Sequence, residues 1–154
     1  MLGLTNQQPT LTSVIAGFMN AGGFGSAIVR KSVTFANTAG HLHLFTVTGD
    51  VLVVLAAVGK GVCASAGGCN ASVGITGSTA AIIALTNVTL INVSEIWHDN
   101  SPDAYIEDSS VLKRFIITGS NDILLTLSAQ ADSGQIDFDC FWTPLSAGAT
   151  VVPV

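Results

Sequence analysis

Apolar side chains recur at every second position along much of this chain, and this period constrains the fold more than any other feature. In the clearest run, the apolar alternate positions are Ile136, Phe138, Cys140 and Trp142. Asp137 and Asp139 lie between them. Because successive side chains of a β-strand point to opposite faces, this run predicts a half-buried strand.

Shorter runs of the same kind precede it. They cover residues 32–35, 42–47, 50–58, 73–75, 82–85, 88–93, 112–118 and 123–128. Residues 50–58 are almost continuously apolar, which is typical of a strand buried on both faces. The Gly-Ser-Asn-Asp segment at 119–122 predicts a hairpin loop between the two runs that flank it. Residues 79–84 are also compatible with one helical turn, but no stretch combines a helical period with caps.

Roughly eight to ten short strands at spacings of about 8–12 residues indicate an all-β chain. We expect an antiparallel β-sandwich of the jelly-roll type, although other Greek-key sandwiches share this pattern. The sandwich domain is expected at residues 30–146. Residues 1–29 are expected to form an extended arm, and residues 147–154 a C-terminal strap.

Both of these end segments are uncharged. A secretory signal has a basic region before its apolar core, and residues 1–29 contain no basic side chain. A membrane helix needs about 20 strongly apolar residues, whereas this segment is interrupted by glycine and asparagine. Such an arm is either disordered or ordered by lying along a neighbouring protein, and its low charge favours the neighbour.

Charge is scarce throughout the chain. Only 10% of the 154 residues are charged, against about 25% in an ordinary domain. Because soluble surfaces are normally rich in Lys and Glu, we expect other protein to cover much of this one. The five basic residues and the net charge of −5 predict no direct nucleic-acid partner and no membrane partner.

Residues 95–108 hold five of the ten acidic side chains together with Trp97, His98 and the only tyrosine. His98 and Asp99 suggest an acid/base pair, and the carboxylates suggest a calcium site. However, the spacing lacks the alternating oxygen donors and glycine of an EF-hand loop. We favour an inter-strand loop in which Trp97 and Tyr105 pack beneath carboxylates that face solvent or a partner.

Two other pairs of polar residues are expected to share a strand face. His41 and His43 could begin a zinc site if His98 or a carboxylate supplied a third ligand, but a polar pair on an exposed or interface face is favoured. Asp137 and Asp139 could form a glycosidase dyad, but the solvated side of a strand is favoured. With neither a nucleophile elbow nor a phosphate loop, we expect no enzyme, no cofactor and no metal.

The cysteines allow two interpretations. Cys63 and Cys69 are separated by a glycine-containing loop that could bring their sulfur atoms within disulfide distance. Two small buried thiols are the favoured alternative. Cys140 is expected in the core.

Four segments carry a resemblance to a known family. These are residues 31–35 (KSVTF), 43–51 (HLFTVTGDV), 95–103 (EIWHDNSPD) and 136–145 (IDFDCFWTPL). They resemble small virion-associated structural proteins of tailed bacteriophages, over roughly residues 30–146. The resemblance implies a virion protein, assembled in the host cytoplasm, that decorates or cements a capsid. Its implied partners are the major capsid protein and copies of itself, with a trimer suiting threefold positions.

We expect the interface on the arm, on the acidic loop and on the strap. The candidate residues are Leu11, Val14, Ile15, Phe18, Phe24, Trp97, His98, Asp99, Asp103, Tyr105, Pro144 and Val151. A tail, baseplate or fibre-base component is a second structural alternative. A receptor- or glycan-binding module is an alternative of another class, because jelly rolls host lectin sites.

Overall fold

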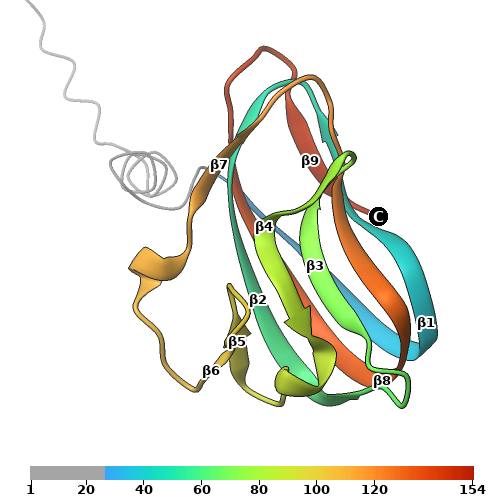
Figure 1. Cartoon of the computed structure of the whole chain (residues 1–154). Coiled ribbons are helices and arrows are strands. Elements are labelled where there is room, and N and C mark those ends of the chain that lie inside the picture. Colours follow the sequence, from blue (N-terminus) through green and yellow to red (C-terminus); the bar gives the residue numbers. More distant parts are fainter. Residues whose placement is uncertain (1–26) are drawn as a thin grey trace, which may run out of the picture.

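The computed structural model describes residues 27–154, which form one antiparallel sheet of nine strands that curls into a half-barrel (Figure 1). The elements are β1 (Ala27–Thr48), β2 (Val51–Ala64), β3 (Asn70–Ile75), β4 (Ser78–Asn87), the 3-10 helix η1 (Val88–Leu90), β5 (Glu95–Trp97), β6 (Asp103–Ala104), the 3-10 helix η2 (Ser109–Val111), β7 (Arg114–Ile117), β8 (Ile123–Pro144) and β9 (Thr150–Pro153). The expected antiparallel all-β class is confirmed.

The long strand β8 organises the sheet. One of its edges pairs with β1 along most of its length. Its other edge pairs first with β3, at residues 123–127, and then with β2, at residues 133–144. The sheet therefore divides at the middle of β8 and bends there, which gives the half-barrel its curvature (Figure 1).

Gly134 permits the close approach of β8 to β2 at this bend. Its φ is 129°, and a Cβ atom there would lie 2.6 Å from Sγ of Cys63. The pairing of β2 with β8 shifts register on both sides of Gly61, so the strands are irregular at this point. Irregularities of this kind increase local bending and twist.

The half-barrel encloses one apolar core. On β8 the expected alternation is confirmed: Ile136, Phe138 and Cys140 are buried in the core cluster. Trp97 from β5 packs edge-to-face on Phe138, with ring centroids 6.3 Å apart. The core thus extends from the long strands to the short strand that precedes the acidic loop.

Two local expectations are wrong, and one is confirmed. The strand expected at 82–85 lies in β4, which also removes the helical turn considered for 79–84, whereas residues 88–90 form η1 rather than a strand. The expected hairpin between 112–118 and 123–128 does not form, because β7 pairs with β2. The loop between β7 and β8 is instead held at the β1–β2 turn, where the Gly119 N–H donates to Asp50 Oδ1 at 3.0 Å and the Gly49 N–H donates to Ser120 Oγ at 2.9 Å.

The structure describes the last three residues of the expected arm and all of the expected C-terminal strap. Residues 27–29 of the expected arm belong to β1, whereas Leu11, Val14, Ile15, Phe18 and Phe24 lie outside the described residues. In the expected strap, β9 pairs with β1 at residues 45–48 of the same chain. None of the helices in the part that the structure describes is long and apolar enough to span a membrane.

Candidate functional site

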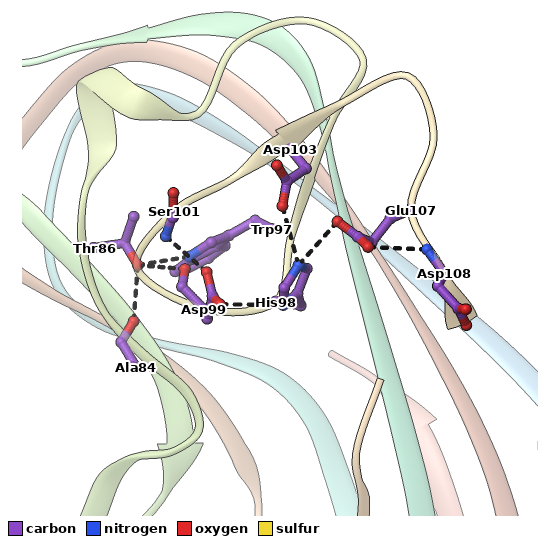
Figure 2. A network of polar contacts seen from close by, with 9 residues as sticks. All are labelled: Ala84, Thr86, Trp97, His98, Asp99, Ser101, Asp103, Glu107 and Asp108. Carbon is purple, nitrogen blue, oxygen red and sulfur yellow. Dashed lines mark hydrogen bonds and ion pairs between the residues drawn. The ribbon is translucent and has the colours of Figure 1, made fainter. Parts of the chain in front are cut away.

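The acidic loop projects from a hairpin at the edge of β2. β5 pairs with β2 at Ala57 and Val58, and β6 pairs with β5. The ring of Trp97 is fully buried, and its Nε1–H donates to Thr86 Oγ1 at 2.8 Å. The Thr86 hydroxyl in turn lies 2.9 Å from the Asp99 carbonyl oxygen. The residues on both sides of His98 are therefore anchored to Thr86 of β4, Trp97 through its side chain and Asp99 through its backbone (Figure 2).

A tight turn at Tyr105 reverses the chain after β6. Tyr105 has a φ of 68°, and the Ile106 N–H donates to the Ala104 carbonyl oxygen at 2.9 Å. This i to i+2 hydrogen bond with a positive φ is typical of a classic γ-turn, which is strained for a bulky residue. The reversal brings Asp103 and Glu107 to the same side of the loop, where both point at His98 (Figure 2).

Three carboxylates thus surround one imidazole. Nε2 of His98 lies 3.5 Å from Asp103 Oδ2 and 3.6 Å from Glu107 Oε2. Nδ1 of the same ring lies 3.6 Å from Asp99 Oδ2. These distances exceed those of good hydrogen bonds. The His98 side chain is only 11% exposed, and its buried Nε2 has no hydrogen-bond partner among residues 27–154.

Backbone N–H groups orient two of these carboxylates. Glu107 Oε1 accepts a hydrogen bond from the Asp108 N–H at 2.9 Å. Asp99 Oδ1 accepts one from the Ser101 N–H at 2.7 Å. Each side chain therefore directs its other oxygen at the His98 ring. Glu107 is the member that the sequence analysis did not single out, because the turn that aims it is set by the backbone of Tyr105.

Asp137 and Asp139 of β8 both accept hydrogen bonds from side chains of β1. Asp139 accepts from Arg30 Nε at 2.6 Å and from Arg30 Nη2 at 2.7 Å, and this pairing raises the pKa of Arg30. Asp137 accepts from Ser32 Oγ at 2.6 Å. Both carboxylates are thus engaged across the β1–β8 ladder, on the face opposite the core.

His41 and His43 are both exposed and share a face of β1. Nδ1 of His41 lies 2.9 Å from Thr126 Oγ1, and Nδ1 of His43 lies 3.1 Å from Asp122 Oδ2. The two residues border an open hollow of about 290 Å³ beside the β3–β4 turn. His98, considered above as their third ligand, contacts the acidic loop instead.

The structure contains free thiols at all three cysteines, and each is buried. Cys69 Sγ lies 3.1 Å from the Ala129 carbonyl oxygen, whereas Cys63 lies against Gly134. The bridge considered between Cys63 and Cys69 is therefore absent, because the two residues pack against different parts of β8. Burial raises the pKa of Cys63 to about 11 and that of Cys140 to about 12, which keeps these thiols protonated and unreactive at neutral pH.

The candidate interface residues separate into two groups. Trp97 and Val151 are buried in the core of the chain, so their side chains are not available to a partner. His98 is also largely enclosed, whereas Tyr105 is 83% exposed. Asp103 and Pro144 are exposed as well.

Large apolar side chains also lie on the surface at positions that the sequence analysis did not select. Those exposed by about half or more are Ile28, Val62, Leu85, Leu90, Val93, Ile106, Ile116, Leu145, Val152 and Val154. Ile106 directly follows Tyr105, beside the acidic loop. The period-two pattern does not reveal such residues, because it does not show which face of a strand lacks cover.

Comparison with known proteins identifies no relative: no family model, curated protein or solved structure matches this chain.

Proposed function

We propose that this protein is a structural subunit of a larger assembly, and that the assembly is the virion of a tailed bacteriophage, where it decorates or cements the capsid. The virion assignment rests on the sequence resemblance. The assembly role rests on the described surface.

An apolar patch on the outer face of the sheet carries the proposal; it lies beside the polar pairs Arg30–Asp139 and Ser32–Asp137. Ile28, Phe141 and Val54 are register partners across β1, β8 and β2, so they share one face of the sheet. This face is opposite the core, because the intervening Val53 and Cys140 point inward. Leu52 and Ile116 are register partners one step further along the same outer face.

Two of these outer-face residues are open to solvent: Ile28 is 54% exposed and Ile116 is 67% exposed. The outer face of an antiparallel sheet is normally polar when it faces water. An apolar patch at such a place is typical of a protein interface. A second copy of this chain or a capsid subunit would therefore gain free energy by covering it.

Unpaired strand edges support the same role. Among residues 27–154, β4 pairs only with β3, and β1 pairs on one edge only over residues 27–43. Edges of this length invite pairing with another chain unless something protects them. In an assembly the neighbouring subunit supplies that protection. The jelly-roll-like sandwich expected from the sequence stays a prediction, as does the trimer.

The glycan-binding alternative receives less support. Recognition surfaces are usually rich in exposed Tyr and Trp. In the acidic loop Trp97 is buried, which leaves Tyr105 as the exposed aromatic residue.

Copy number in purified particles tests the proposal. Quantitative mass spectrometry against the major capsid protein should give a ratio corresponding to hundreds of copies per particle. A few dozen copies or fewer would place the protein in the tail or baseplate and overturn the capsid role. Absence from particles would overturn the virion role.

A pair of matched variants tests the surface. Ile116→Asp should reduce retention on particles, because a charge would have to be buried in the interface. Thr76→Asp is the control, since this residue is exposed in the turn between β3 and β4, which is not part of this face. Equal retention of both variants would show that the outer face of β7 is not the contact.

A further inference from the structure

We infer that His98, Asp103 and Glu107 form a binding site for a divalent transition-metal cation of the zinc class. This inference is independent of the proposed virion role, because it rests on the acidic loop alone.

The spacing of the donor atoms fits such an ion. One atom from each residue lies within 4.8 Å of the other two. Zn²⁺ holds nitrogen and oxygen ligands at about 2.0–2.2 Å, so two ligands of a tetrahedral ion lie about 3.4 Å apart. The distances from His98 Nε2 to Asp103 and Glu107 are 3.5 and 3.6 Å. They are too long for hydrogen bonds and close to the separation that a shared ion would produce.

The enclosed Nε2 of His98 is independent evidence for a ligand. A buried nitrogen without a partner costs roughly 1–3 kcal/mol, so native structures rarely leave one. This atom is buried, has no hydrogen bond among the described residues, and is directed at Asp103 and Glu107 (Figure 2). A cation between the three side chains would satisfy the nitrogen and both carboxylates together.

The surroundings of the cluster match those of known metal sites. A metal-ligating histidine usually directs its other ring nitrogen at a carboxylate, which fixes its orientation. Here Asp99 lies on the Nδ1 side of the ring. Glu107 is itself held by the Asp108 N–H. The hydrogen bond to Glu107 Oε1 leaves Oε2 available to bind the ion, and Asp99 is placed on the side of the ring where an orienting carboxylate would lie.

The ligand set also indicates the class of ion. Imidazole favours zinc, copper, iron and nickel, whereas an all-oxygen set favours calcium and magnesium. One nitrogen and two carboxylates give three protein ligands, which leaves a fourth position of a tetrahedral ion for water or another group. A bound ion would join β5, β6 and the segment before η2.

Zinc binding to the full-length chain tests the inference. The protein is stripped with a chelator and titrated with Zn²⁺ in a calorimeter. We expect one ion per chain. Asp103→Asn and Glu107→Gln should each weaken binding at least about tenfold, and His98→Gln should abolish it. Asp99→Asn should weaken binding by about 10–100-fold, as outer-shell changes do. Circular dichroism shows whether each variant keeps the β fold.

Two controls exclude other sites. The double variant His41→Gln/His43→Gln removes the exposed histidine pair and should bind Zn²⁺ as the unmodified protein does. Co²⁺ in place of Zn²⁺ should give a visible spectrum without thiolate charge-transfer bands, because the three cysteines are not ligands.

Three results would overturn the inference. They are absence of Zn²⁺ binding, binding that survives in both Asp103→Asn and Glu107→Gln, and binding that is lost in the His41/His43 variant.

Discussion

The half-barrel and the segment at residues 91–113, here called the excursion, are stabilised in different ways. In the half-barrel, β1 and β8 each contain 22 residues and pair along most of their length. In the excursion, β5 contains three residues and β6 two. Backbone ladders and an apolar core hold the first region, whereas side chains that accept from nearby backbone N–H groups hold much of the second.

Asp99, Glu107 and Asp108 illustrate the second kind of stabilisation. Each accepts a hydrogen bond from the N–H of a residue one or two positions further along the chain. Such contacts shape turns but bury little apolar surface. The half-barrel is therefore stabilised by its own strand pairing and apolar core. The excursion depends on a few anchoring side chains, above all Trp97, and on whatever group completes the cluster around His98.

Gly134→Ala should cause the largest loss of stability, because it affects the bend of the half-barrel. The added Cβ would lie 2.6 Å from Cys63 Sγ and 2.7 Å from Cys63 Cα, and it would force alanine into a φ of 129°. Overpacking and backbone strain together should cost at least about 3 kcal/mol of unfolding free energy. Chemical denaturation measures this change.

Gly67→Ala is its matched control. A Cβ at this position meets nothing within 4 Å. The free energy of unfolding should change by less than about 1 kcal/mol. If the two alanine variants were equally stable, the close approach at Gly134 would not be what shapes the bend.

Trp97→Phe should have the next largest effect, because it weakens the contact between the two regions. The substitution removes the Nε1–H that donates to Thr86 and leaves a small cavity beside Phe138. We expect a loss of about 2 kcal/mol from the missing hydrogen bond and packing.

Tyr105→Phe is the control within the excursion, since its side chain is 83% exposed. It should change the stability by less than about 0.5 kcal/mol. Equal effects of the two variants in thermal unfolding would contradict the anchoring role of Trp97.

The same contrast explains how much the sequence could predict. Alternation around Phe138 and the apolar run at 50–58 place strands correctly, because burial of one or both faces dictates those patterns. The pairing of β7 with β2 was not predictable in this way, since the hairpin expectation considered only the loop residues. The decisive contacts are made by Gly49 and Asp50, about 70 positions earlier in the chain.

The candidate site was predictable only in its composition. The density of carboxylates around His98 is visible in the sequence, and so is the surrounding acidic segment. The approach of Asp103 and Glu107 to one nitrogen depends on the positive φ of Tyr105. Because residues other than glycine and asparagine rarely adopt this conformation, no pattern in the sequence indicates it. Burial of Trp97 beneath the loop was expected, but the same expectation for Tyr105 is wrong, because its side chain is 83% exposed. Exposure of Ile116 depends on which strands cover β7.

Acid should affect the two regions separately, and this is the smallest effect that we predict. Hydrogen bonds from the Ala66 N–H and from Gln130 lower the pKa of Asp132 in the half-barrel. The Ser110 N–H and hydroxyl lower the pKa of Asp108 in the excursion. A carboxylate whose pKa is lower in the folded state stabilises that state above its ordinary pKa, and the contribution disappears as the pH falls through the lowered value.

Asp132→Asn should therefore reduce the pH dependence of global unfolding below pH ~4, because the group that would be protonated is gone. Asp108→Asn should leave global unfolding almost unchanged and alter only amide exchange near η2, because the excursion can open while the sheet remains folded. Denaturation curves between pH ~2.5 and ~6, with hydrogen exchange on the same samples, measure both. If Asp108→Asn changed global unfolding as much as Asp132→Asn, the excursion and the half-barrel would unfold as one cooperative unit. The stabilising contacts of the excursion would then be as important to the fold as the ladders of β8.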